Sequence, residues 1–182
     1  MKQKTEFLDL KKLKYELKSN KTISVEKAKV KPSTCKVTFT YLKKLNEDIK
    51  SHGVTQQNNA FKTLKALEDL DLNPGLIMYN YYLQGKCHYL NFKRSDSLES
   101  IENAVECYRK VFQTARRFRV KAKNPKYHFK YAESIHKLSK HVFCLFKQNE
   151  LQNKAYLIAI HSGKLFPESQ SLSWLRRDIL DS

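Results

Sequence analysis

The sequence has few of the residues that interrupt regular structure: four glycines and four prolines among 182 residues. All-β folds need many turns, and turns depend on these residues, so their scarcity argues against a sandwich or barrel and indicates long helices. Valine and threonine are too few for a sheet protein, whereas lysine, leucine, glutamate, glutamine and alanine, which favour helices, are abundant. We therefore predict an all-α fold.

Cysteine is sparse and widely spaced, at Cys35, Cys87, Cys107 and Cys144, with no C-x-x-C pair. This spacing disfavours a zinc site built from local ligands. Each cysteine has apolar neighbours at helical spacing, where a free thiol usually behaves as a small buried hydrophobic group. We expect four free thiols and a reducing compartment.

Long apolar runs are missing as well. No run reaches the roughly 18 apolar residues that a membrane-spanning helix needs, and the first residues, MKQKTEFLDLKKLKYELK, lack the apolar segment of a secretory signal. We expect a soluble protein of the cytoplasm or nucleus without a membrane span.

Sequence motifs for catalysis or metal binding are missing too. There is no G-x-x-x-x-G-K-[ST], H-E-x-x-H or G-x-S-x-G. His88 is adjacent to Cys87, and neighbouring helical residues point about 100° apart, so the two cannot share a ligand. His136 and His141 are five residues apart, which is the wrong spacing for one helix face. We predict that the protein is not an enzyme and needs no metal or cofactor.

Acidic residues are in the minority: 18 against 35 lysines and arginines, for a formal net charge of +17. A chain this basic repels itself, which favours an anionic partner. Nucleic acid, an acidic protein and an anionic membrane surface all satisfy that condition, and the charge alone does not choose among them.

Apolar residues recur every three or four positions along most of the chain, which predicts helices. Gly53 is expected to end the second helix in a left-handed conformation, and Pro74 to stop the third. The fourth helix is apolar on two faces, which indicates packing on two sides. The expected helices cover residues 5–18, about 33–53, 61–70, 75–92, 98–122, 127–146 and 151–165, with a last short helix at 172–179.

Seven or eight such helices with short connections predict a stack of antiparallel pairs. Helices four and five end near residue 122 and helices six and seven near 167, a spacing of about 45 residues that suggests a repeat. We expect residues 1–53 to form a basic N-terminal helical extension that packs, as one domain, with a helical array at 54–182.

Part of this array, roughly residues 75–167, resembles a tetratricopeptide repeat. That family's second helix has an alanine, an aromatic residue four positions on, a small residue three further on and a helix-ending proline, and its first helix has an aromatic residue four before a glycine. The matching residues are Ala155, Ala159, Ser162 and Pro167, then Ala104, Tyr108 and Val111, and finally Tyr81 and Gly85. Gln84 and His88 depart from the pattern. The resemblance implies a helical solenoid whose groove holds a peptide, without catalysis.

The stretch TARRFRVKAKNPKYHFK, residues 114–130, holds seven lysines or arginines and no acid. On a wheel for a helix over 98–122, its cations gather in an arc opposite the apolar stripe, which is expected to include Phe118. We predict a basic helix face that continues around the following turn and binds an anion or a partner; the alternative is ordinary solvated surface. Its residues are Arg109, Lys110, Arg116, Arg117, Arg119, Lys121, Lys123, Lys126 and Lys130.

A second candidate site lies on the fourth helix. Tyr81 falls between the two apolar stripes of that helix, so it is the tyrosine expected to face a groove, and Asn80 and Lys86 are polar residues suited to holding a peptide. These observations favour a protein-interaction module that binds an acidic protein segment or a larger assembly. The alternative is a nucleic-acid-binding protein that contacts RNA or DNA through the basic face.

Overall fold

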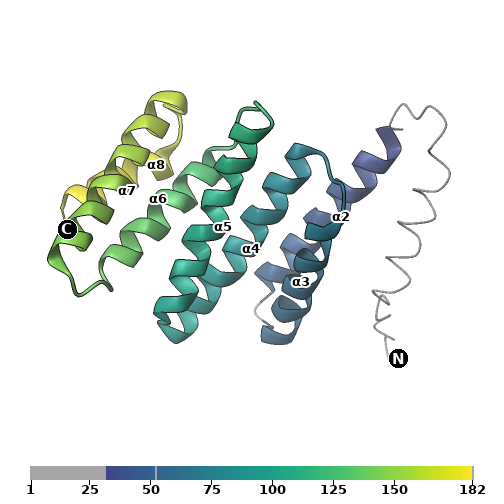
Figure 1. Ribbon diagram of the computed structural model, residues 1–182, viewed down its shortest axis with the longest axis horizontal. Helices are drawn as coiled ribbons and strands as arrows, with labels where there is room; N and C mark the ends of the chain where they lie inside the picture. The colour runs from purple at the N-terminus through teal and green to yellow at the C-terminus, as the bar shows by residue number, and fades with distance from the viewer. Residues whose placement is uncertain (1–31, 52, 182) are drawn as a thin grey trace. The chain divides into compact units, whose positions relative to one another are not determined.

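A computed structural model describes residues 32–51 and 53–181 (Figure 1). These residues form α-helices and one short 3-10 helix, with no β-strand among them, which confirms the predicted fold class. The helix predicted at residues 5–18 lies outside the described residues. The elements are α2 (Pro32–Lys50), α3 (Val54–Ala66), η1 (Leu67–Asp69), α4 (Pro74–Ser95), α5 (Leu98–Arg117), α6 (Pro125–Ser139), α7 (Leu145–Leu165) and α8 (Gln170–Leu180).

Two compact units divide the chain within α2, one ending at Lys43 and the other comprising Lys44–Ser182. The expected division at residue 53 into a basic extension and an array stays a prediction. All further description concerns the unit from Lys44 onward. None of the helices that the structure describes is long and apolar enough to cross a membrane.

Helix starts follow the capping residues of the sequence. The Asn73 side chain accepts a hydrogen bond from the Leu76 amide at 3.0 Å, directly before Pro74, which opens α4. Ser97 and Asn124 cap α5 and α6 in the same way, and Pro125 follows Asn124 at the first helical position. A capping side chain satisfies an amide that has no partner inside the helix, and proline needs none there, so these starts are encoded locally.

Helix ends follow the sequence less closely. Gly53 has φ −81° and precedes α3 as its N-cap, so the expected left-handed termination of α2 at this glycine is wrong. Helix α5 ends at Arg117 rather than near residue 122. Arg119 adopts the left-handed conformation with φ 53°, and the Val120 amide donates to the Ala115 carbonyl at 2.9 Å. These are the marks of a Schellman termination, which usually has glycine at the left-handed position.

Helix α6 is shorter than expected as well. It ends at Ser139, and a turn leads to Leu145, where α7 begins. Phe143 and Phe146 lie within the range 127–146 that was predicted as one continuous helix, and both are exposed because the turn redirects the chain.

Consecutive helices run antiparallel and side by side (Figure 1). Helix α3 packs against α4, α4 against α5, α5 against α6, and α6 against both α7 and α8. Helices α4 and α5 approach closely at Gly85: a Cβ atom there would lie 2.7 Å from the ring of Tyr108. Only glycine fits this contact without a shift of its neighbours.

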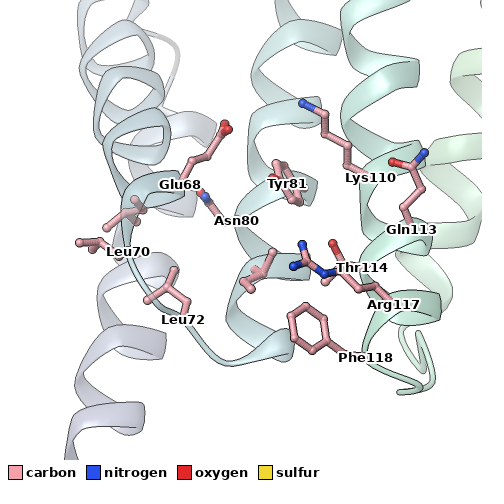
Figure 2. Close-up of a pocket in the computed structure, with 12 residues that line it drawn as sticks. Glu68, Leu70, Leu72, Asn80, Tyr81, Lys110, Gln113, Thr114, Arg117 and Phe118 are labelled. Atoms are coloured by element: carbon pink, nitrogen blue, oxygen red, sulfur yellow. The ribbon is translucent and has the colours of Figure 1, made fainter. Parts of the chain in front are cut away.

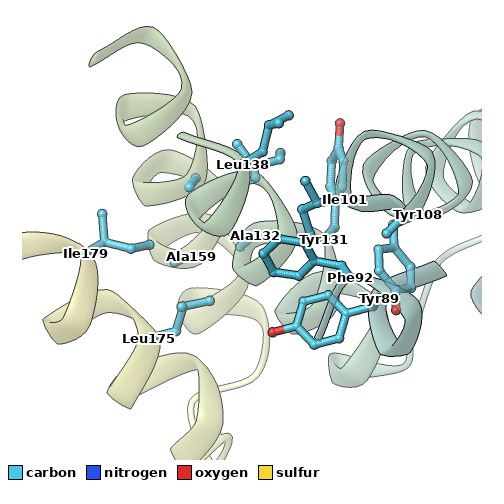
Figure 3. Packing of buried hydrophobic residues seen from close by; sticks show 13 residues of the cluster. Tyr89, Phe92, Ile101, Tyr108, Tyr131, Ala132, Leu138, Ala159, Leu175 and Ile179 are labelled. Atoms are coloured by element: carbon cyan, nitrogen blue, oxygen red, sulfur yellow. The ribbon is translucent and has the colours of Figure 1, made fainter. Parts of the chain in front are cut away.

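The largest apolar cluster joins α4 through α8 (Figure 3). Ala132, Ala155 and Ala159 are fully buried within it, and their small side chains allow α6 and α7 to approach closely. Helix α8 contributes Leu175 and Ile179 to the same cluster, both buried. Burial of each large aliphatic side chain stabilises the fold by about 1.5–3 kcal/mol, so this cluster is a main source of stability.

Candidate functional site

A pocket of about 590 Å³ opens between η1, the first half of α4 and the second half of α5 (Figure 2). Side chains of α5 line one side, η1 and the connection after it line the other, and α4 lies between them. The lining residues are Leu67, Glu68, Leu70, Leu72, Ile77, Asn80, Tyr81, Lys110, Gln113, Thr114, Arg117 and Phe118.

The α4 side of the pocket contains a buried amide, Asn80, which is only 2% exposed. Its Nδ2 donates a hydrogen bond to the Leu64 carbonyl at 3.1 Å, which ties α4 to α3. Its Oδ1 is buried and has no hydrogen-bond partner among the described residues. A buried acceptor without a donor costs about 1–3 kcal/mol, so a donor that reached this oxygen from the pocket side would relieve that cost.

Apolar side chains make up much of the lining. Leu67 is buried, and Leu70, Leu72 and Ile77 are half-buried, so part of each surface faces the pocket. Phe118 lies at the opposite edge and is 42% exposed. These residues can bury an apolar side chain of a ligand and remove its surface from water.

Two cations on α5 lie beside this apolar surface. The Nζ of Lys110 is 5.4 Å from the ring centroid of Tyr81, and the guanidinium of Arg117 is 5.3 Å from that of Phe118. Aromatic rings attract cations over their faces, so both contacts restrict the two side chains. Within the described chain, neither Lys110 nor Arg117 forms an ion pair, which leaves both charges available to an anion.

Glu68 is the one carboxylate in the lining, and Lys65 already pairs with it at 3.0 Å. Burial acts to raise the pKa of this carboxyl, but hydrogen bonds from Lys65 and Gln84 outweigh burial, and Lys110 adds a weaker attraction. The pKa is therefore lowered, and Glu68 stays charged. Because Lys65 forms an ion pair with Glu68, the negative charge of Glu68 is largely offset. It therefore cancels only part of the positive potential of Lys110 and Arg117.

The predicted basic face is not one helix face. Arg109, Lys110, Arg116 and Arg117 belong to α5, but Arg119, Lys121 and Lys123 lie in the α5–α6 connection, and Lys126 and Lys130 on α6. A helical wheel does not apply beyond Arg117, since the chain turns at the left-handed Arg119. The exposed cations of this corner are Arg116, Arg117, Arg119, Lys121, Lys123 and Lys126, and none of them forms an ion pair among the described residues.

Three predicted site residues lie apart from the pocket. Arg109 pairs with Glu106 at 2.8 Å, and Lys130 pairs with Glu133 at 2.6 Å while its Nζ lies 4.6 Å from the Tyr89 ring centroid. Lys86 is half-buried and donates to Asn46 Oδ1 at 2.8 Å. Burial and the nearby Lys50 lower the pKa of Lys86 to about 8. All three have partners within the fold and no contact with the pocket lining.

The two sequence candidates nevertheless converge, because Asn80 and Tyr81 of α4 meet Lys110 and Arg117 of α5 in one pocket. Sequence reasoning missed the apolar lining, namely Leu67, Leu70, Leu72, Ile77 and Phe118, together with Glu68, Gln113 and Thr114. The stretch LEDLDLNPG, with leucines between acids just before a helix-stopping proline, was the available signal. A connection that is only exposed to solvent seldom contains three leucines, so this composition indicates that the connection packs against something.

Titratable side chains elsewhere do not assemble into a second chemical site. In the part of the chain that the structure describes, no group of three histidines, cysteines or acids is placed to hold a metal ion. Cys87 and Cys107 are buried free thiols, as expected, whereas Cys144 is exposed, which corrects the expectation that it is buried. The side chain of Cys35 lies outside the described ones.

In comparisons with known proteins, no family model, no curated protein and no solved structure matches this chain. Its function is therefore argued from the pocket and the surface.

Proposed function

We propose that the protein is an interaction module that binds an acidic segment of a partner protein in the pocket between η1, α4 and α5. The observation that carries the proposal is the combination in one pocket of the unpaired cations Lys110 and Arg117, the unsatisfied acceptor Asn80 Oδ1 and an apolar surface. A peptide can supply one group for each: a carboxylate, a backbone N–H and an aliphatic side chain.

The size of the pocket fits this ligand. A volume of about 590 Å³ is within the range of small-ligand sites and holds a few residues of a peptide rather than a folded domain. Arg116, Arg119 and Lys121 continue the positive charge beyond the pocket, so acidic residues next to the bound ones also meet cations. Complementary charge raises the association rate and excludes basic or neutral competitors.

We also propose that α4–α5 and α6–α7 are tetratricopeptide-like pairs. The burial of Ala155 and Ala159 and the contact of Gly85 with Tyr108 support this, since the resemblance assigns small residues to the points of closest helix approach. The proposed pocket lies between α4, α5 and the preceding η1.

The cellular location that we propose is the cytoplasm or nucleus. Three free thiols among the described side chains, one of them exposed, suit a reducing compartment, where disulfides seldom persist. We propose no catalytic activity, cofactor or metal.

Nucleic-acid binding is the second candidate, and the observation that favours it is the run of six exposed, unpaired cations from Arg116 to Lys126. Phosphate contacts require such cations and little else. Phosphate contacts make no use of the apolar lining formed by Leu70, Leu72 and Ile77, whereas the aliphatic side chain of a peptide can be buried against it. We therefore place peptide binding first.

A panel of labelled probes tests the proposal on the wild-type chain. The probes are an acidic peptide with interspersed leucines, the same peptide with serine for leucine, the same with glutamine for each acid, and a single-stranded oligonucleotide. We expect the acidic leucine peptide to bind at least about tenfold more tightly than either altered peptide, because each loses one of the two complementary surfaces.

Two results would decide against the proposal. Equal binding of the leucine and serine peptides would mean that the apolar lining is not used. Tightest binding of the oligonucleotide, with an affinity that falls at a log–log slope of about −0.7 per phosphate as salt rises, would establish the nucleic-acid alternative.

A further inference from the structure

Far from the pocket, the connection between α6 and α7 presents an apolar tip: Phe143, Leu145 and Phe146 are 105%, 69% and 80% exposed. Three large apolar side chains that lie this close together and are this exposed are unusual in a protein that uses such residues for its core. The tip includes the exposed Cys144 between Phe143 and Leu145.

Backbone and ring contacts fix the position of this tip. The His141 and Val142 amides donate to the carbonyls of Leu138 and Ser139, and the Gln148 amide donates to that of Cys144 at 2.8 Å. The His141 ring meets Phe92 edge-on at 5.2 Å, and its Nε2 lies 3.7 Å from Asp96 Oδ1. The connection therefore rests against the α4–α5 turn, while its apolar side chains point away from the core.

Cations surround the tip. Lys137 and Lys140 precede it, Lys147 follows it directly, and the adjoining end of α4 carries Lys93 and Arg94, of which Arg94 donates a hydrogen bond to Gln57 Oε1 of α3. The acids of the same segments are Asp96, which lies next to His141, Glu99 in the first turn of α5, and Glu150, one turn further along α7. The edge of the molecule that bears the apolar tip is thus predominantly positive.

We propose that this tip inserts into an anionic lipid surface, with Phe143, Leu145 and Phe146 entering the interface and the surrounding lysines contacting the headgroups. Exposed aromatic and leucine side chains flanked by lysine have the composition of segments that lie in membrane interfaces. A lipid surface accepts a convex tip without a preformed cavity, whereas a protein partner would need a matching pocket for each phenylalanine. Binding of this kind is peripheral and independent of the peptide site.

Vesicle binding tests the proposal on the full chain. Vesicles of phosphatidylcholine with phosphatidylserine are compared with phosphatidylcholine alone, for the wild type, Phe143→Ser/Phe146→Ser and a control, Leu157→Ser/Trp174→Ser. The control removes two exposed apolar side chains of α7 and α8 outside the tip. We expect the wild type and the control to bind the anionic vesicles alike, and the tip variant to bind about tenfold more weakly or worse.

Cys144 gives a direct reading of insertion, because a polarity-sensitive dye can be attached there. Burial raises the pKa of Cys87 to about 12 and of Cys107 to about 11, which keeps both thiols unreactive near neutral pH, and Cys35→Ser removes the remaining thiol. We expect the dye emission to shift to the blue with anionic vesicles.

Several outcomes would overturn this inference. They are an absence of wild-type binding to anionic vesicles, equal binding by the wild type and the tip variant, or an unchanged emission of bound protein. The last two would mean that the general positive charge holds the protein on the lipid without the tip. The inference would also be overturned if the protein did not bind vesicles but bound another protein through the tip, because the partner of the tip would then be that protein.

Discussion

Helices α4–α5 and helices α6–α8 use the same antiparallel packing but differ in what lies beside their buried polar groups. Between α6, α7 and α8 many contacts are made by alanines and large aliphatic side chains, including Ala155, Ala159 and Leu175. Helix α6 also buries His128 and His136, and His128 hydrogen-bonds to Ser162 of α7 at 2.9 Å. At the α3–α4–α5 contact, α4 buries the amides Asn80 and Gln84, and each leaves an acceptor without a hydrogen-bond partner among the described residues. Both regions therefore bury polar groups, and what sets α4 apart is that Asn80 lies in the lining of a pocket together with apolar and cationic side chains.

This difference indicates which buried groups are candidates for function. Binding sites often carry unsatisfied or strained groups that a purely structural core excludes. The pocket has both an unsatisfied acceptor, Asn80 Oδ1, and unpaired cations at its edge. The α6–α8 region also contains buried polar atoms without a hydrogen-bond partner among the described residues, namely the Ser134 hydroxyl and the His136 ring nitrogens. The unsatisfied acceptor of Asn80 is distinguished by the cations and the apolar side chains that share its pocket.

The largest expected effect is a core truncation in α8. Leu175 is 1% exposed, and Leu175→Ala should lower the free energy of unfolding by about 2–5 kcal/mol, since it removes buried methyl groups and leaves a cavity. Leu72→Ala in the half-buried pocket lining is the matched change, with less than about 1 kcal/mol expected because less surface is buried. Urea denaturation of both variants measures the difference; equal losses would contradict the contrast between the regions.

The next effect concerns the close approach of α4 and α5. Gly85→Ala places a Cβ 2.7 Å from the Tyr108 ring and should destabilise the protein by about 1–3 kcal/mol through overpacking. Gly163→Ala on α7 is the control: no heavy atom lies within 4 Å of its Cβ, so the gain in helix propensity should stabilise by up to about 1 kcal/mol. Thermal melts report both, and a stabilising Gly85→Ala would mean that the helices are further apart.

Acidification should destabilise the fold through three histidines, two on α6 and one on α4. Burial lowers the pKa of His88, His128 and His136, so the folded state favours the neutral rings. The unfolded state then takes up protons first as pH falls below about 6.5, which means that stability is retained above that pH and lost below it. Urea midpoints measured on both sides of pH 6.5 should fall on acidification, and by less in His128→Asn. Identical midpoints would show that these histidines are hydrated.

The smallest effect is at the end of α5. Arg119 is left-handed, a conformation that glycine adopts without steric cost, so Arg119→Gly should be about 1 kcal/mol more stable than Arg119→Ala. The alanine variant removes the same charge and serves as the control. If the two variants melt alike, residue 119 is not left-handed, and α5 continues further toward residue 122, as its sequence pattern suggested.

Much of the fold could be predicted from local patterns, because α4, α5, α6 and α8 begin within about two residues of the predicted helix starts at 75, 98, 127 and 172. Asn73, Ser97 and Asn124 cap three of these starts, which explains why they are encoded locally. The ends of α5 and α6 could not be predicted in this way. An arginine at the left-handed position of α5 is not a recognisable stop signal, and no glycine or proline marks the turn after Ser139.

The site was predicted only in part for a related reason. Asn80, Tyr81, Lys110 and Arg117 are recognisable by residue type, but their meeting in one pocket depends on how α4 packs against α5, which periodicity does not specify. The sequence does not show that Leu70, Leu72 and Phe118 line a pocket, because the identity of an apolar residue does not reveal whether another part of the chain covers it. The partners of Arg109 and Lys130 are acids within three residues, so those two pairs could have been anticipated.

The most direct test of the central claim compares two charge-reversal variants of equal net charge. Lys110→Glu/Arg117→Glu changes the pocket, and Lys154→Glu/Lys164→Glu changes two exposed lysines of α7. Fluorescence anisotropy with the labelled acidic leucine peptide measures the affinity of each, after circular dichroism has shown that both are folded. We predict that the pocket variant binds at least about tenfold more weakly than the α7 variant, which should stay within about threefold of the wild type. Equal weakening of the two variants would contradict the account, because net charge rather than the pocket would then hold the peptide.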